Sequence, residues 1–327
     1  MTRTRSTLIS VAASGVLLAV LYSRLDVRSI GAALLDADPR LLVISIALII
    51  PITFVRAVRF FWVAPPGAVP GMAEALRLTL VSSAVNLFAP AKTGDLVKSH
   101  FVATRGDRPA GVSIALVIYE RLSDLFGLIL WCVLGWGLGR PDVAGLPAAF
   151  WVLLGVFGSV CGVLILSSRA AAIVKAIIAK ARPHGRFERL LTLAEGWPDL
   201  LQILGRRRYS IVLLSLGLWL GHLSQIWTFT IALETPVPFW VCAALSAIAL
   251  MAGQVPFTLA GLGARDVALV VLMSAYMAPA TAAAMGILIA TRGLVPALLG
   301  LPLIWPYVAS HVGQGTKRSS STTSQNA

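Results

Sequence analysis

The sequence predicts an all-α integral membrane protein with about eight transmembrane helices and one re-entrant or broken helix. The 327-residue chain is 57% hydrophobic and only 13% charged, and its mean hydropathy is +0.85. A soluble domain carries about 25% charged residues, so a large soluble protein with buried helices fits this composition poorly. Several apolar runs also reach the ~20 residues that cross a bilayer core roughly 30 Å thick.

The charge balance is strongly basic, with 27 Lys and Arg against 14 Asp and Glu and a net charge of +13. In a membrane protein such an excess indicates cytoplasmic loops that face anionic lipid headgroups. The sequence contains no nucleic-acid-binding motif, and its histidines are scattered. Cys132, Cys161 and Cys242 lie in apolar runs without CxxC spacing, as packing residues do. We therefore predict no nucleic-acid partner, no metal site and no cofactor.

Eight apolar runs are candidate crossings. The first follows Arg3 and Arg5, as the hydrophobic region of a signal peptide does, but Tyr22-Ser23-Arg24 is a poor cleavage site. We therefore expect a retained first helix. The predicted crossings are 7–23, 41–63, 110–139, 148–168, 209–232, 239–254, 265–278 and 281–307.

The charge of the loops predicts the orientation of the helices. Segment 169–208 contains nine Lys and Arg, so it is expected in the cytoplasm. Loops 140–147 and 233–238 carry almost no basic residues and are expected outside. With these assignments, the apolar segment 76–91 enters and leaves the membrane by the same face, as a re-entrant hairpin or half-helix. Both termini are then cytoplasmic in a multi-pass protein of the inner membrane.

The chain divides into a transmembrane domain, residues 1–312, and a polar tail, 313–327, whose low complexity predicts disorder. Within the basic segment 169–208, apolar residues such as Ile173 and Ile177 share one helical face. This pattern is typical of an amphipathic helix on the anionic inner leaflet, and an ordinary solvated loop helix fits it equally well.

Several charged residues lie inside the predicted crossings, where each costs several kcal/mol and calls for an explanation. Glu120 sits near the middle of its crossing, with Asp124 on the same helical face and Arg121 about 100° around the helix. Arg292 lies deep in the last crossing and needs an anion, because arginine does not lose its proton. Arg56 and Arg59 share a face near the end of the second crossing, where they either face the same site or snorkel to the interface.

Two apolar runs are interrupted in the same manner. "NLFAPAKTGDLVKSH" (86–100) and "VPFTLAGLGARDVALVV" (255–271) each contain Pro and Gly and then an acid where a new helix would begin. Broken helices expose backbone amides that favour anions, and paired breaks in two halves indicate a transporter-like site. The sequence predicts either an inverted repeat, with 86–95 and 256–266 meeting near mid-membrane, or two unrelated helix breaks.

The charges of these segments favour an anionic ligand. The two interrupted segments and the crossings that carry charged residues together contain seven basic residues against four acidic ones. This excess of three suits a phosphate-bearing headgroup better than a cation. We expect no catalytic residues. The candidate substrate-binding residues are Arg56, Arg59, Asn86, Lys92, Asp95, Glu120, Arg121, Asp124, Arg265, Asp266 and Arg292. The seventh basic residue of the count is Lys98.

Four motifs in this order resemble the lysylphosphatidylglycerol synthase transmembrane (flippase-like) family: R-x-x-R-x-x-W, N-x-x-x-P-x-x-x-G-D, E-R-x-x-D and G-L-G-x-R-D. In this sequence they comprise Arg56, Arg59 and Trp62; Asn86, Pro90, Gly94 and Asp95; Glu120, Arg121 and Asp124; and Gly261, Gly263, Arg265 and Asp266.

The resemblance implies a multi-helix protein of the inner membrane, and in the best-known members this region is taken to flip aminoacylated phosphatidylglycerol between leaflets. Two departures matter. The family often has Pro-Gly-Gly where this chain has Leu259-Ala260-Gly261, so that turn is expected to differ. Only a short tail follows the last helix, in place of the cytosolic aminoacyl-transferase domain of full synthases, so lysyl transfer is not expected.

The leading functional hypothesis is a flippase for an anionic phospholipid or a polyprenyl-phosphate-linked lipid. Arg292 and Arg265 would capture the headgroup, and Glu120 and Asp124 would balance charge or carry a proton. One alternative is a membrane-embedded enzyme acting on a lipid-linked substrate, with Glu120 or Asp95 as general base. The other is a non-transporting partner of pathway enzymes in lipid or glycan metabolism. Self-association into a homo-oligomer is compatible with each of these three hypotheses.

Overall fold

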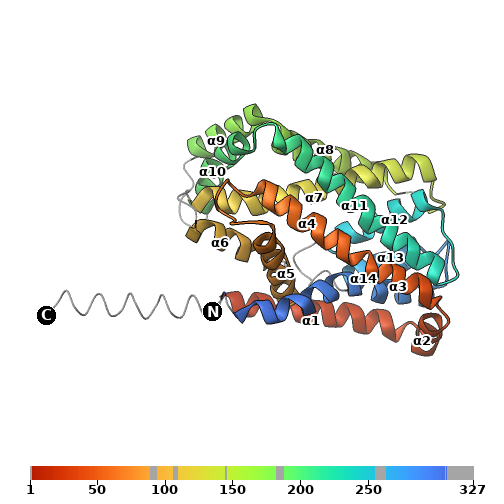
Figure 1. Ribbon diagram of the computed structural model, residues 1–327. Coiled ribbons are helices and arrows are strands. Elements are labelled where there is room, and N and C mark those ends of the chain that lie inside the picture. The colour runs from red at the N-terminus through yellow and green to blue at the C-terminus, as the bar shows by residue number, and fades with distance from the viewer. Residues whose placement is uncertain are drawn as a thin grey trace.

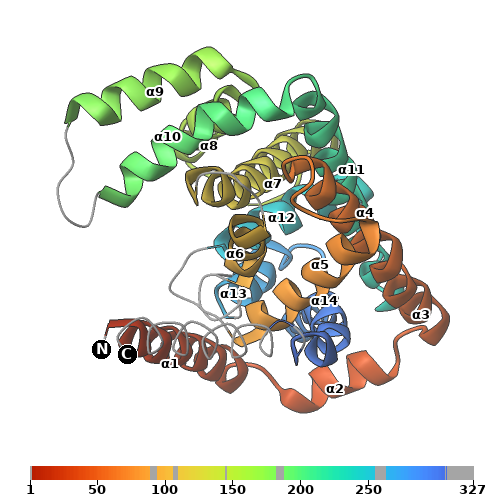
Figure 2. The ribbon, with the colours of Figure 1, turned by 60° about the vertical axis from the view of Figure 1, so that its left-hand side comes forward.

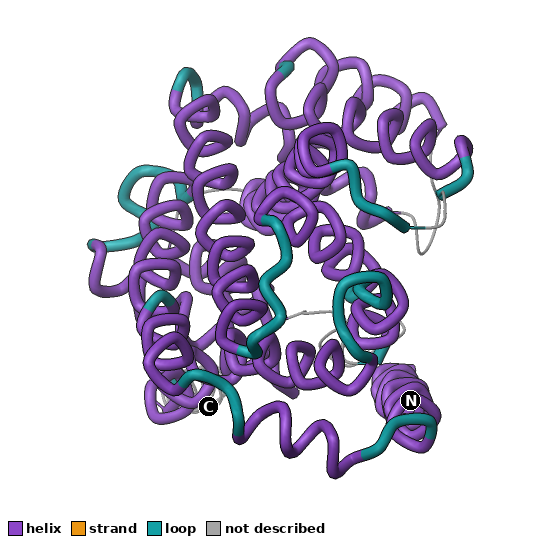
Figure 3. The backbone as a smooth tube through the Cα atoms, turned by 90° about the vertical axis from the view of Figure 1, so that its right-hand side faces the viewer, coloured by secondary structure: helices purple, strands orange, loops and turns teal. Residues whose placement is uncertain are grey.

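Every regular element in the described part of the computed structural model is a helix, which confirms the all-α prediction (Figures 1 and 3). The structure describes residues 2–88, 94–105, 110–143, 146–181, 188–254, 263–305 and 307. The helices are α1 (Thr2–Ser23), α2 (Val27–Leu35), α3 (Pro39–Ala47), α4 (Ile49–Val63), α5 (Met72–Phe88), α6 (Leu96–Arg105), α7 (Ala110–Gly139), α8 (Ala148–Leu166), α9 (Ser168–Ala181), α10 (Glu188–Leu204), α11 (Arg207–Ala232), α12 (Phe239–Ala252), α13 (Ala264–Leu272) and α14 (Pro279–Gly300), followed by the short 3₁₀ helix η3 (Leu301–Leu303).

Five helical segments of the described chain are long and apolar enough to cross a membrane. The shortest has 19 residues and is therefore ~28 Å long, close to the hydrocarbon thickness of a bilayer. The five are Pro39–Val63 (α3 with α4), Gly111–Gly139, Ala148–Leu166, Arg207–Ala232 and Pro279–Leu303.

Large apolar side chains also cover the outer surface of α8, as a lipid-facing helix requires. Val152 is 63% exposed, Leu153 68% and Val156 59%. Contiguous exposed apolar surface of this kind is rare on soluble monomers. The protein is therefore a polytopic membrane protein.

The predicted crossings 239–254 and 265–278 form a helical hairpin. The helix α13 has nine residues and is only ~14 Å long, too short to cross a bilayer. The turn that follows α13 lies at the end of the molecule where α12 begins. The Asp142 N–H, in the loop after α7, donates to the Tyr276 hydroxyl of this turn at 2.5 Å, and Gly139 at the end of α7 lies against Val241 at the start of α12. The apolar composition of these runs does not record where the chain reverses, so the sequence predicted two crossings here.

A second helical hairpin enters from the opposite end. The helices α5 and α6 lie in the left half of Figure 1, toward the end of the molecule that carries α9 and α10, whereas α12 and α13 lie on the right. Pairing between Gly94, at the start of α6, and Asn86, near the end of α5, shows that the chain reverses between them. This agrees with the re-entrant segment predicted over 76–91. The two hairpins have opposite orientations, as an inverted repeat would require.

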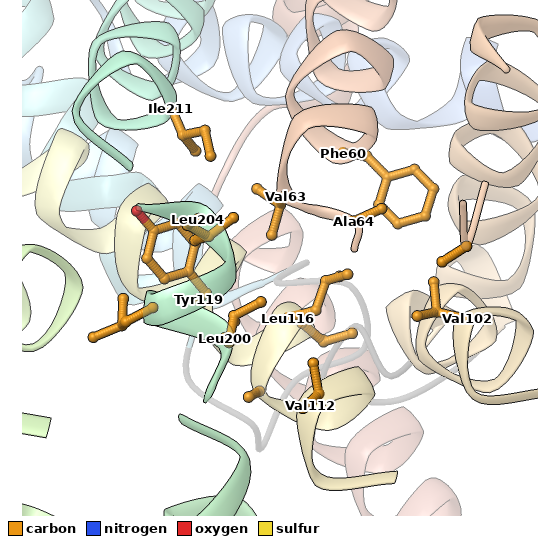
Figure 4. Close-up of a cluster of buried hydrophobic side chains, with 14 of the residues drawn as sticks. Phe60, Val63, Ala64, Val102, Val112, Leu116, Tyr119, Leu200, Leu204 and Ile211 are labelled. Atoms are coloured by element: carbon orange, nitrogen blue, oxygen red, sulfur yellow. The ribbon is translucent and has the colours of Figure 1, made fainter. Parts of the chain in front are cut away.

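A buried apolar cluster holds the α5–α6 end of the protein together (Figure 4). Phe60 of α4, Leu116 and Tyr119 of α7 and Leu200 of α10 are all fully buried in it. Burying one such side chain stabilises a fold by about 1.5–3 kcal/mol. The cluster fixes α4 and α7, which carry five of the predicted site residues, against each other.

The basic segment 169–208 forms the antiparallel pair α9 and α10 at the edge of the molecule, with α10 packed against α7 and α9 outermost (Figure 2). On α9, Ile173 is 60% exposed and Ile177 62% exposed, close to Lys175. Exposed apolar side chains thus lie beside a basic residue on α9, which is the pattern on which the prediction of an amphipathic surface helix rests.

Two aspartates cap the short helices α2 and α3. Asp38 precedes Pro39 at the start of α3, and its carboxylate accepts the N–H groups of Arg40 at 2.8 Å and Leu41 at 3.5 Å. Asp26 caps α2 in the same way. The Ser29 hydroxyl and the backbone N–H of Arg28 hold the pKa of the Asp26 carboxyl below its usual range.

Replacing Asp38 with alanine should destabilise the protein by about 1 kcal/mol, because two N–H groups at the start of α3 lose their acceptor. Thermal unfolding of the purified protein in detergent measures this change. Asp36→Ala is the matched control, since Asp36 is exposed and caps α2 only through its backbone N–H. Equal losses in the two variants would contradict the capping role.

Candidate functional site

A cavity of about 420 Å³ lies where the two hairpins meet α4, α7, α11 and α14. Seven of the predicted site residues line it: Arg56, Arg59, Asn86, Arg121, Asp124, Arg265 and Arg292. Three more, Asp95, Glu120 and Asp266, are buried and form ion pairs with basic residues around it. Lys92 and Pro90 lie outside the described residues.

The α5–α6 hairpin is held by a close backbone approach. The Gly94 N–H donates to the Asn86 side-chain oxygen at 2.8 Å, and a Cβ at Gly94 would lie 2.6 Å from the backbone nitrogen of Asn86. Only glycine fits there without a backbone shift. Asp95 follows directly and accepts hydrogen bonds from the Ser82 hydroxyl and the Asn86 amide. The motif residues Asn86, Gly94 and Asp95 thus position one another.

Asp95 also begins a chain of buried ion pairs. Its carboxylate pairs with Arg121 of α7 and lies 3.7 Å from the Lys98 ammonium. Lys98 in turn pairs with Glu120 at 3.2 Å. A buried charge is tolerated only when it is paired and hydrogen-bonded, and these four residues satisfy that requirement for one another.

The chain of ion pairs continues to α4. Arg59 lies 3.6 Å from the Glu120 carboxylate and pairs directly with Asp124. The indole N–H of Trp219 also donates to Asp124, at 3.2 Å, and the Arg59 guanidinium donates to the Ser215 hydroxyl at 3.2 Å. Arg59 does not snorkel, since only 4% of the residue is exposed. We call the residues from Arg121 through Asp95, Lys98, Glu120 and Arg59 to Asp124 the ion-pair chain.

The start of α13 supplies the opposite wall of the cavity. Gly263 has a φ of +91°, a conformation that favours glycine, and its N–H donates to the Asp266 carboxylate at 3.0 Å. The Asp266 carboxylate also accepts from Arg265 at 2.6 Å, and Arg265 donates to the Gly286 carbonyl of α14 at 3.0 Å. Arg265 is therefore fixed, although it lines the cavity.

Two cavity arginines have no ion-pair partner in the described part of the chain. The Nε and Nη1 atoms of Arg292 are buried without a hydrogen-bond partner, and Arg56 forms no ion pair. Of the 14 acidic residues in the sequence, only Asp107 lies outside the described ranges. Asp124, the one acid among the described lining residues, is already paired with Arg59. Arg292 therefore faces a polar cavity, and none of the described carboxylates supplies the anion that the sequence predicts for it.

Four polar residues that line the cavity, Ser83 of α5 and three others, were not among the predicted site residues. His222 and Trp219 lie on one face of α11, with ring centroids 5.3 Å apart, and Gln254 follows α12. The i, i+3 spacing of Trp219 and His222 was the available signal. Gln254 and Arg265 flank the second helix break, whose residues 255–262 are not described, and both line the same cavity as Asn86.

These features define a polytopic helical membrane protein with a basic cavity at the meeting point of two oppositely oriented hairpins. The sequence matches the family described as lysylphosphatidylglycerol synthase TM region over residues 7–300, and the chain belongs to that family. The match confirms the resemblance found in the four motifs. A comparison with curated proteins gives no match. The family connects the chain with lipid metabolism or transport in a membrane.

Proposed function

We propose that this protein is a lipid flippase that binds a phosphate-bearing headgroup in its cavity and moves the lipid between the leaflets of the inner membrane. The observation that carries the proposal is that Arg56 and Arg292 form no ion pair with the described residues, in a cavity whose described lining contains one acid. An anion is the ligand that such a site stabilises.

The remaining cavity arginines are suited to a different role. Arg59, Arg121 and Arg265 are held by Asp124, Asp95 and Asp266 and so form a rigid basic wall. A headgroup that binds the guanidinium groups of Arg56 and Arg292 would displace no ion pair of the described residues. The hairpins would open the cavity to one leaflet and then to the other, as repeats do in transporters with paired broken helices.

The enzyme alternative is less well supported. Glu120 and Asp95, the predicted general bases, both pair with Lys98 and neither lines the cavity. A base has to reach the proton that it removes. The third hypothesis, a non-transporting partner, is separated from a flippase by a transport measurement.

The test is a transport assay with the purified protein in liposomes that contain a fluorescent phosphate-bearing lipid. Loss of fluorescence to a membrane-impermeant reductant reports exposure of the lipid at the outer leaflet. We expect the wild-type protein to accelerate that exposure. Mass spectrometry of the same lipids would detect a new product if the protein were an enzyme, and liposomes with neither change would favour the non-transporting partner.

The matched variants fill open space at two glycines. Gly293 lines the cavity, and a Cβ there meets nothing within 4 Å, so Gly293→Phe should occupy the cavity without displacing backbone. We expect at least tenfold slower transport in this variant. Gly155 of α8 is equally open but lies outside the cavity lining, so Gly155→Phe should transport at the wild-type rate. Transport by Gly293→Phe at that rate would exclude this cavity as the pathway.

The proposed orientation places the loop after α7 outside and the α9–α10 end in the cytoplasm. Cys132, Cys161 and Cys242 are buried, so engineered cysteines can be labelled selectively. We expect a membrane-impermeant maleimide to label Asp142→Cys in intact cells and Arg206→Cys only after permeabilisation, because both positions are exposed at opposite ends. The reverse labelling would place both termini outside.

A further inference from the structure

The charges around the cavity do not balance within the described chain. Six basic residues and four acidic residues belong to the cavity and the ion pairs behind it, which leaves a net charge of +2. The basic residues are Arg56, Arg59, Lys98, Arg121, Arg265 and Arg292, and the acidic residues are Asp95, Glu120, Asp124 and Asp266.

The remaining sequence offers no carboxylate within the two helix breaks. The undescribed stretch 89–93 contains one ionisable residue, Lys92, and 255–262 contains none. The other undescribed segments hold a single acid, Asp107, which is followed by Arg108. A net charge of +2 at this depth is costly unless an external anion compensates it.

We propose that the cavity selects a lipid whose headgroup is a phosphate monoester over a lipid whose headgroup is a phosphodiester. This inference rests on the proposed function and specifies its substrate class. A monoester carries a charge of about −1.5 to −2 at pH 7 and three acceptor oxygens. A diester carries a single negative charge and leaves one guanidinium uncompensated. Arg56 and Arg292 together match the dianion.

The lining of the cavity favours a lipid over a soluble phosphate ester. Beside the arginines it contains the apolar side chains of Leu87, Leu218, Leu250, Ile289 and Leu294, which come from four helices. Apolar lining with a few convergent polar groups is typical of sites for ligands with an apolar part. An acyl or polyprenyl chain next to the phosphate would bury this surface.

The test compares phosphatidic acid with phosphatidylmethanol of identical acyl chains, since the methyl ester removes one negative charge and adds little volume. Binding to the purified full-length chain in detergent is measured by native mass spectrometry at pH 7.5. We expect phosphatidic acid to bind at least about tenfold more tightly than its methyl ester, and phosphatidylcholine to bind more weakly than both. Glycerol phosphate, a soluble monoester, should compete only at far higher concentration.

The variants remove one charge each. In Arg292→Gln, and separately in Arg56→Gln, one guanidinium remains and the preference for phosphatidic acid should fall to about threefold or less. Having two variants protects the test against one that does not fold. Arg77→Gln is the control, because the Arg77 side chain is 62% exposed on α5 and lies 3.7 Å from Glu74, so the preference of this variant should equal the wild-type value.

Each outcome decides a separate question. Equal binding of phosphatidic acid and its methyl ester would overturn the monoester inference, and transport of a diester lipid in liposomes would leave the flippase proposal standing. Competition by glycerol phosphate at the concentration of the lipid would overturn the lipid as the source of the monoester. Wild-type preference in both Arg292→Gln and Arg56→Gln would place selection outside this cavity.

Discussion

Arg292→Leu should abolish lipid transport and at the same time stabilise the folded protein. No described residue offers a hydrogen-bond partner to the buried Nε and Nη1 atoms of Arg292, so this part of the chain leaves its charge uncompensated. An arginine at the centre of a transmembrane helix costs about 2.5–3.5 kcal/mol on insertion scales. Leucine removes that cost, and we expect a gain in unfolding free energy of about 2 kcal/mol, measured by thermal unfolding beside the transport assay.

Arg292→Lys separates charge from geometry at the same position. Lysine keeps the positive charge but loses the planar fork that binds two phosphate oxygens together. Transport should therefore fall about tenfold without the gain in stability. Arg77→Leu, an exposed arginine of α5, controls for a general effect of removing charge. A less stable Arg292→Leu variant would show that Arg292 has a structural role. A variant that still transports lipid would show that Arg292 does not bind the transported headgroup.

The sequence was most informative about the intramembrane charges. Arg59, Arg121 and Asp124 stood out because charged residues in long apolar runs are costly, and the structure places all three at the cavity. The sequence could not predict which acid pairs with which base. Glu120 and Asp124 share a helical face, yet of the two only Glu120 pairs with Lys98, whereas Arg59 lies close to both carboxylates. The reason is that α4 and α6 approach α7 from different sides.

Lys98 was counted among the charges but left out of the candidate site. It follows a helix break, where a loop lysine is ordinary, and nothing local to its sequence indicates burial. The structure buries it to 3% exposure between Asp95 and Glu120. Its role depends on the fold of the α5–α6 hairpin, which hydropathy alone does not resolve.

The α12–α13 hairpin shows the same limit. Apolarity continues on both sides of the break at 255–262, so length and hydropathy favour two crossings. The nine-residue length of α13 follows from Gly263 at its start and the turn at Met273–Met277 at its end. The signal for the reversal was the repeated pattern of Pro, Gly and acid shared with 86–95.

Glu120→Gln should be among the most destabilising single substitutions in the protein. The Glu120 carboxylate lies 3.2 Å from the Lys98 ammonium and 3.6 Å from the Arg59 guanidinium, and all three side chains are at most 5% exposed. Glutamine removes the negative charge and leaves a buried lysine whose remaining acid is Asp95 at 3.7 Å. Removing one partner of a buried ion pair costs about 3–5 kcal/mol, and denaturant or thermal unfolding in detergent would measure the loss.

A double variant shows whether the loss comes from the unpaired charge. Lys98→Met with Glu120→Gln removes both charges and should recover most of the stability, because a methionine stem replaces the lysine stem in the same space. Glu195→Gln on α10 is the matched control, since Glu195 is exposed and its loss should cost well under 1 kcal/mol. A double variant as unstable as Glu120→Gln would mean that the carboxylate supports the α4–α7 contact by a route other than its pairing with Lys98.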